Sequence, residues 1–269
     1  MSTAPRFAYA QARIQARVSA LPVEGDWQRL SGARSLSGYL EEARTGTLRT
    51  WVKGFSAQSN CHDLERGLRA QFLDAVEQTA AFVPRPWREA VLWWRWLPLL
   101  PLFAHARAGR MLPPWTGRDY RLAGLLDGQA RFDAAALRRR GIDILVEPSA
   151  VAADPKRDHI DDVLALWVLH WRARWPSLAR ADGARLNALI DRLHQHVGAF
   201  TDAAPDKAWN LRRALRDRLR LDLHRQLMQP TVIFLYLAMV AVDLERLRRA
   251  LVDRALFTPD SAVRGAEAA

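Results

Sequence analysis

Apolar residues recur every three or four positions along most of this chain, which is the spacing of one buried face of an α-helix. Strand-like alternation is almost absent, with one short run at Ile142–Val146. The pattern predicts an all-α protein of about nine to twelve helices, given typical helix and loop lengths. The helical rows are Phe7–Leu21, Leu64–Val76, Ile160–Trp167, Leu186–Leu193, Leu211–Leu227 and Leu244–Leu251.

Several predicted helices begin at residues that suit a helix N-terminus. Ser35 is expected to cap a short helix over Leu36–Ala43, and His62-Asp63 to cap the helix that follows. A further set of carboxylates stands at the expected start of another helix, where the positive end of the helix dipole favours them. These carboxylates are Asp158, Asp161 and Asp162.

Two strongly apolar segments are predicted to be buried helices rather than membrane spans. Pro230–Val242 covers only 13 residues, whereas a span needs roughly 20. Ala90–Ala106 is interrupted by Arg95, Pro98 and Pro101. Because Met1–Pro5 carries no apolar stretch of a secretory signal, a cytoplasmic protein is expected, which can lie peripherally on the inner face of a membrane.

The charge balance favours an acidic partner. The chain has 40 basic and 29 acidic side chains, a formal charge of +11. Nucleic acid, anionic lipid headgroups and acidic protein surfaces all suit such a charge. The 11 tryptophans include Trp93-Trp94 and the i+4 series Trp167, Trp171 and Trp175. They fit either a packed helix stripe or an exposed platform for single-stranded nucleic acid.

No arrangement of residues points to catalysis. The chain has neither a GxxxxGK[ST] nor a GxGxxG loop. A single cysteine, Cys61, excludes a multi-cysteine metal site, and His194 and His196 are two residues apart, so on a helix they cannot chelate one metal. We therefore expect no catalytic residues, no metal site and no cofactor.

Arginines accompany the leucine row near the C-terminus. Arg212, Arg216 and Arg220 are four residues apart and align on one helix face. Two interpretations remain open for this face, which is expected to be exposed: a solvated surface, or a docking surface for an acidic partner.

Several segments resemble the C/d family of proteins from the V-type (vacuolar) and A-type (archaeal) rotary ATPases. Pro101 and Arg246 stand where the family has Asn, so the resemblance is to a divergent and short member. The segments that carry it are Phe7–Leu21, Ser35–Thr45, His62–Arg69, Arg121–Gly128, Trp209–Arg216 and Tyr236–Arg248.

The resemblance implies a funnel-like bundle of three similar helical units. The units would be residues 1–118, 119–218 and 219–269, the third abbreviated and ending in a short flexible tail. It also implies a non-catalytic coupling subunit: a socket between the central stalk and the proteolipid rotor ring of a proton- or sodium-transporting ATPase. The partner-binding residues would be Arg107, Asn210, Arg212, Arg216 and Arg248.

The alternative function is that of a basic helical nucleic-acid-binding protein, which the charge and the tryptophan content also suit. The two functions predict different surfaces. A coupling subunit would carry arginines on several faces, whereas a nucleic-acid-binding protein would have one continuous basic groove with exposed tryptophans.

Overall fold

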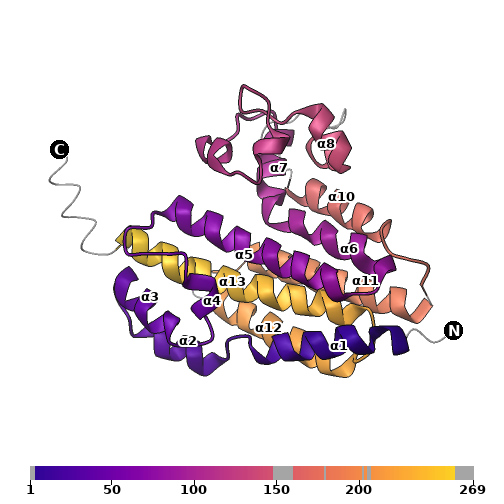
Figure 1. Ribbon diagram of the computed structural model, residues 1–269, viewed down its shortest axis with the longest axis horizontal. Coiled ribbons are helices and arrows are strands. Elements are labelled where there is room, and N and C mark those ends of the chain that lie inside the picture. The colour runs from indigo at the N-terminus through magenta and orange to yellow at the C-terminus, as the bar shows by residue number, and fades with distance from the viewer. Residues whose placement is uncertain (1–3, 148–159, 179, 202, 205–206, 258–269) are drawn as a thin grey trace. The chain divides into compact units, whose positions relative to one another are not determined.

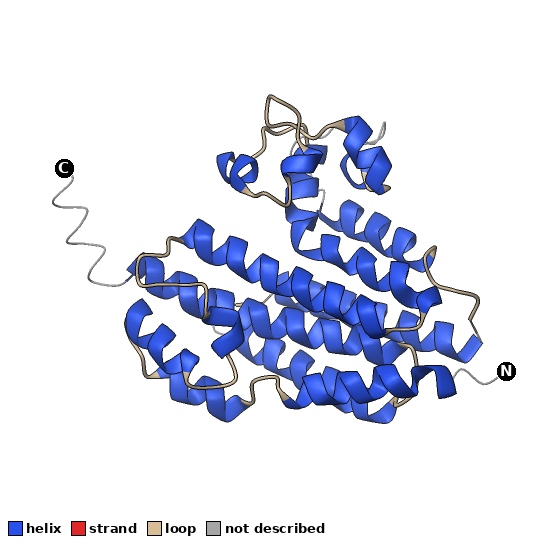
Figure 2. Ribbon diagram, viewed as in Figure 1, coloured by secondary structure: helices blue, strands red, loops and turns tan. Residues whose placement is uncertain are grey.

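A computed structural model confirms an all-α protein (Figure 1). It describes residues 4–147, 160–178, 180–201, 203–204 and 207–257. Within these ranges Figure 2 shows helices and loops but no strand, and one isolated bridge joins Leu126 to Phe132. The thirteen described α-helices exceed the predicted number because three of them, α4, α6 and α9, have only four or five residues.

The chain forms two compact units, and each is described by itself. Unit 1 comprises Met1–Val91 and Pro176–Ala269, and unit 2 comprises Leu92–Trp175. These junctions do not coincide with the boundaries after residues 118 and 218 that the resemblance implies, and residue 218 lies inside a helix. The predicted tail, Ser261–Ala269, lies outside the described residues.

The longest of the described helices lie in unit 1. Unit 1 contains α1 (Ala4–Ser19), α2 (Glu24–Ser31), α3 (Leu36–Arg44), α4 (Arg49–Val52), α5 (Cys61–Phe82), α11 (Arg180–Thr201), α12 (Ala208–Arg225) and α13 (Thr231–Phe257). α6 (Arg88–Leu92) crosses the first junction, and unit 2 contains α7 (Leu100–Arg107), α8 (Ala134–Arg140), α9 (Asp143–Val146) and α10 (Ile160–Arg172).

α13 is the central helix of unit 1. Every residue from Thr231 to Val240 is buried, because α13 contacts α1, α3, α5, α11 and α12; in Figure 1 it lies between α5 and α12. The prediction of a buried helix for this segment is therefore confirmed.

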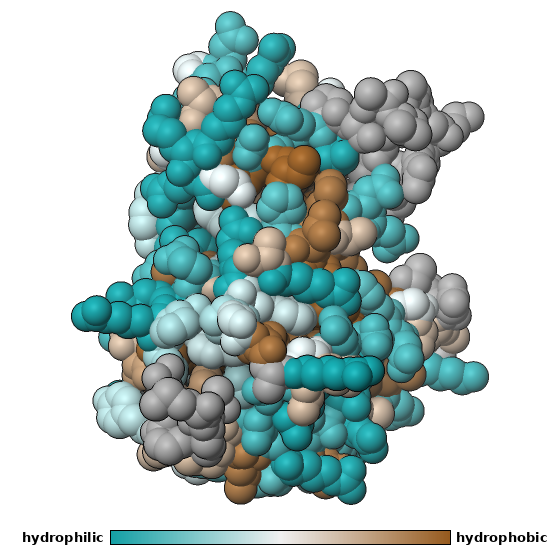
Figure 3. Space-filling view, turned by 90° about the vertical axis from the view of Figure 1, so that its right-hand side faces the viewer, coloured by the Kyte–Doolittle hydropathy of each residue, from teal (hydrophilic) through white to brown (hydrophobic). Residues whose placement is uncertain are grey.

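No helix among the described residues is both long and apolar enough to cross a membrane. On the face shown in Figure 3, hydrophobic residues are interspersed with hydrophilic ones.

α12 packs its leucine row against the core of unit 1. Leu215, Leu219 and Leu223 are buried. The ends of the row differ, because Leu211 is half-buried and Leu227 follows the end of the helix and is 46% exposed.

The predicted helix caps have different outcomes. The side chain of Ser35 accepts a hydrogen bond from the backbone N–H of Gly38, so the cap of α3 is confirmed. The cap predicted at His62-Asp63 is wrong. α5 begins before it, at Cys61, and the Asn60 side chain accepts the N–H of Asp63 at 3.0 Å. Asp161 and Asp162 lie in the first turn of α10, and Asp158 lies outside the described residues.

Tryptophans form the core of unit 2. Trp94 makes edge contacts with Trp167 and Trp171, at ring-centre distances of 5.7 and 5.4 Å. The indole N–H of Trp93 donates to the carbonyl of Trp167 at 3.0 Å. All four side chains are at most 3% exposed. The packed stripe is therefore the correct interpretation for these residues, and a stacking platform built from them is wrong.

The strand-like run Ile142–Val146 is helical from Asp143 onward. Gly141 ends α8 with a left-handed backbone, φ 64°, which is accessible to glycine without a steric penalty. α9 then begins at Asp143. Ile142 and Leu145, three residues apart, are both fully buried, so the run presents one helical face to the core rather than two strand faces.

Candidate functional site

Two adjoining cavities of unit 1 lie among α2, α3, α12 and α13, and we call them together the arginine cleft. The α12 cavity is the one that Arg213, Arg216 and Arg220 of α12 line, and its volume is about 100 Å³. The α13 cavity is the one that Arg249, Asp253 and Arg254 of α13 line, and its volume is about 510 Å³. They share Glu24, Trp27, Trp209 and Arg246. Seven arginines and four carboxylates line the cleft, which leaves a formal charge of 7 − 4 = +3. They are Arg212, Arg213, Arg216, Arg220, Arg246, Arg249 and Arg254, with Glu24, Asp217, Asp243 and Asp253.

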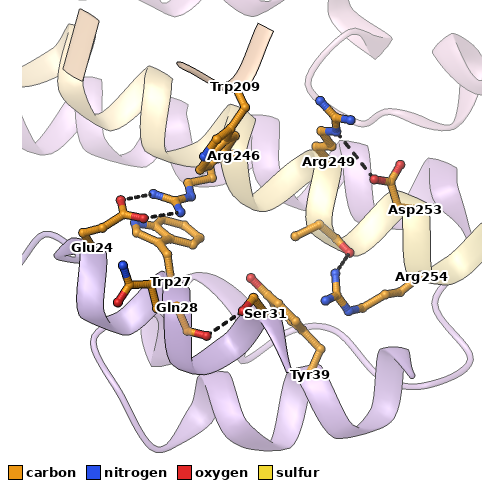
Figure 4. A pocket seen from close by; sticks show the side chains of 11 residues that line it. Glu24, Trp27, Gln28, Ser31, Tyr39, Trp209, Arg246, Arg249, Asp253 and Arg254 are labelled. Carbon is orange, nitrogen blue, oxygen red and sulfur yellow. Dashed lines mark hydrogen bonds and ion pairs between the residues drawn. The ribbon is translucent and has the colours of Figure 1, made fainter. Parts of the chain in front are cut away.

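Arg246 stands at the border of the two cavities. It donates two hydrogen bonds to the Glu24 carboxylate, at 2.8 and 3.1 Å. Its guanidinium lies over the rings of Trp27 and Trp209, 4.5 and 3.9 Å from their centres (Figure 4). The hydrogen bonds from Arg246 lower the pKa of Glu24, against the opposing effect of burial. This stack ties α2 to α12 and α13, and so fixes the shape of both cavities.

Arg216 and Asp243 form a buried ion pair in the wall of the α12 cavity. Nε and Nη2 of Arg216 donate to the Asp243 carboxylate at 3.0 to 3.1 Å. The two side chains are 14% and 3% exposed. Burial raises the pKa of Asp243 to about 6, although the hydrogen bonds and charge of Arg216 lower it. At neutral pH the carboxylate is therefore mostly ionised, and Arg216 is its counter-ion.

Arg212 and Arg248 share one acidic partner. Both contact the Glu245 carboxylate, at 3.3 and 3.4 Å. Arg212 also lies over the ring of Phe200, at 4.5 Å, and Arg248 pairs with Glu65. This network joins α5, α11, α12 and α13, so both cations serve contacts within unit 1.

The predicted partner-binding residues have different surroundings. The expectation of an exposed face at Arg212 and Arg216 is wrong, because their side chains are only 15% and 14% exposed and pair with acids of α13. Asn210 is exposed in the first turn of α12. Arg107 belongs to unit 2, where it donates to the carbonyl of Ile144 at 3.0 Å. The predicted set therefore does not form one site within either unit.

The cleft presents three arginines to solvent, Arg213, Arg220 and Arg249; the basic run along the sequence of α12 already contains the first two. Arg213 and Arg220 are exposed, line the α12 cavity, and form no hydrogen bond or ion pair with any described residue. They are seven residues apart, which places them on nearly the same side of α12. Arg249 is 49% exposed on α13 and pairs weakly with Asp253 at 3.6 Å. These three guanidiniums are accessible to an external anion.

Two further searches, for metal ligands and for similar proteins, give no second candidate site among the described residues. Within the part of the chain that the structure describes, no group of three or more His, Cys, Asp or Glu side chains is placed to hold a metal ion. Comparisons of the chain with protein-family models, with curated proteins and with solved structures found no match.

Proposed function

We propose that this protein is a non-catalytic coupling subunit of a V-type or A-type rotary ATPase. In this function it is a socket between the central stalk and the proteolipid rotor ring, on the cytoplasmic face of the membrane. The proposal starts from the sequence resemblance, and the all-α fold is compatible with it. The three-unit funnel, the contact with the ring and a contact with anionic headgroups are parts of the proposal.

The observation that carries the proposal is the presence of two kinds of arginine in one cleft. Arg216 and Arg246 are held by Asp243 and Glu24, so they give the cleft a fixed shape. Arg213 and Arg220 have no such partner among the described residues and are exposed. Guanidinium groups that face solvent in a preformed wall suit carboxylates of an acidic protein, because the fork of N–H donors matches a carboxylate.

Nucleic-acid binding has less support. The tryptophans most suited to a stacking platform, Trp94, Trp167 and Trp171, are buried in unit 2. In the cleft, the rings of Trp27 and Trp209 are covered by Arg246. Base stacking needs free aromatic faces, and the basic surface that remains would give only binding that weakens strongly with salt.

The proposal is tested by reversing the charge of the two exposed arginines. Arg213→Glu with Arg220→Glu should weaken capture of the central-stalk proteins of its own cell by roughly tenfold or more, because it places like charges opposite acidic side chains. The matched control is Arg139→Glu with Arg140→Glu, the same charge change on exposed positions of α8. Circular dichroism melts check that both variants fold.

Two results would contradict the proposal. One is a cleft variant that captures stalk proteins as well as the wild type does. The other is tight, sequence-selective binding of the wild type to nucleic acid at physiological salt, which would favour the alternative function.

A further inference from the structure

The α13 cavity has the size of a small-molecule site. Its volume of about 510 Å³ lies within the range of roughly 300–1,000 Å³ that is typical of ligand pockets. The neighbouring α12 cavity, at about 100 Å³, is too small for this. α2 and α3 form one side of the larger cavity, and α12 and α13 the other (Figure 4).

The polar groups of the α13 cavity include several hydrogen-bond donors. The hydroxyl of Tyr39 points into it (Figure 4). Burial raises the pKa of this phenol to about 12, so it stays protonated and can donate. Arg246 uses two of its five N–H groups on Glu24. Ser31 instead donates its hydroxyl to the carbonyl of Gln28 at 2.6 Å.

The ion pair at the rim of the cavity is weak. Arg249 and Asp253 are 3.6 Å apart, and their side chains are 49% and 55% exposed. Exposed pairs of this kind contribute little to stability, because water and salt screen them. An incoming anion can therefore replace Asp253 as the partner of Arg249 at small cost.

The aromatic rings of the cavity already make cation–π contacts with arginines. Arg246 covers Trp27 and Trp209, and Arg254 lies over the ring of Tyr39 at 4.4 Å. Their faces are thus occupied, and a flat aromatic ligand would have to displace a guanidinium in order to stack. A ligand recognised through hydrogen-bond donors and positive charge fits better. The lining has three arginines and two carboxylates, a net charge of 3 − 2 = +1.

We propose that the α13 cavity is a binding site for a small polyanion, with phosphate or carboxylate groups that accept hydrogen bonds from Arg249, Tyr39 and Arg246. The ligand can be free in solution or be the headgroup of an anionic lipid. The two proposals share Arg246, but this one does not depend on the function proposed above, because its test changes Arg249 and Asp253 and leaves Arg213 and Arg220 in place.

Calorimetric titration of the full chain at low salt tests the site, with tripolyphosphate and citrate as probes. We expect saturable binding with one ligand per chain. Arg249→Gln should weaken it roughly tenfold, the order expected for one charge-assisted hydrogen bond. Asp253→Asn should strengthen it, because it removes a competing carboxylate beside Arg249.

The control variant is Arg139→Gln, which makes the same charge change on an exposed face of α8 in unit 2. It should leave the affinity unchanged. Equal losses in Arg249→Gln and Arg139→Gln would show attraction by net charge alone and would overturn the proposal. Absence of saturation by either probe would overturn it too, and so would unchanged affinity in Asp253→Asn.

Vesicle flotation distinguishes the two sources of the ligand. Vesicles of phosphatidylcholine with phosphatidylglycerol are compared with pure phosphatidylcholine vesicles. Flotation that is reduced by Arg249→Gln, and by competing tripolyphosphate, assigns the site to a lipid headgroup. Binding of the soluble probes without flotation assigns it to a free polyanion.

Discussion

Replacing Arg216 with Gln removes the counter-ion of a carboxylate that is only 3% exposed. Unpairing one member of a buried ion pair costs about 3–5 kcal/mol. Asp243 has a pKa of about 6, and loss of Arg216 would raise it further, so the carboxyl can take up a proton instead of remaining buried and charged. The expected loss in the free energy of unfolding at neutral pH is therefore about 3 kcal/mol, the lower end of that range.

Urea denaturation followed by circular dichroism measures this loss. The matched control is Arg213→Gln on the same helix, at an exposed position without a hydrogen bond or ion pair to any described residue; its effect should stay within about 0.5 kcal/mol. The cost of Arg216→Gln should shrink as the pH falls below 6, because Asp243 is then protonated in both proteins. If Arg216→Gln costs no more than Arg213→Gln at neutral pH, the pair does not stabilise the fold and the reasoning is refuted.

Three other substitutions test the packing of α12 and α13. Because burial raises the pKa of Asp243 above its ordinary value of 3.8, the folded state binds this proton more tightly than the unfolded state does, and the free energy of unfolding should fall as the pH rises from about 4 to about 6. Asp243→Asn should remove that part of the pH dependence, and urea titrations of both proteins across the window would contradict the assignment if their slopes agreed. Leu219→Ala, at a fully buried position, should cost about 2–5 kcal/mol. Leu221→Ala, at a 40% exposed position, should cost less than about 1 kcal/mol, and similar thermal melts of the two variants would show that the leucine row does not face the core.

The helices could be predicted because their signal is local. The row Leu215, Leu219 and Leu223 has one helical period, and burial follows directly from it. Short elements were predicted less well. Ile142–Val146 has β-branched and apolar residues typical of a strand, but no second strand exists among the described residues for it to pair with. Asn60 was missed as a cap because Asp63, three residues later, is also of a residue type that favours a helix N-cap.

The inward direction of Arg212 and Arg216 was also present in the sequence, in the angular positions of α12. At about 100° per residue, Arg212 and Arg216 lie only about 20° and 60° from the centre of the Leu215–Leu223 row, whereas Arg213 and Arg220 lie about 100–120° from it. The first two therefore point into the protein with the leucines, and the last two point to its flank.

The identity of the partners could not be read from the same helix. A guanidinium at a buried position needs an acid opposite it, and the acids that meet Arg212 and Arg216 are Glu245 and Asp243, about thirty residues later on α13. Sequence order does not specify which turn of α13 faces which turn of α12, because the packing of two helices sets that register. The same limit applies to the α13 cavity, whose walls come from four helices and whose donors are brought together only by the fold. Periodicity therefore separates the arginines of α12 that form buried ion pairs from those that are exposed. The tertiary contacts decide which of the exposed arginines line the same cavity.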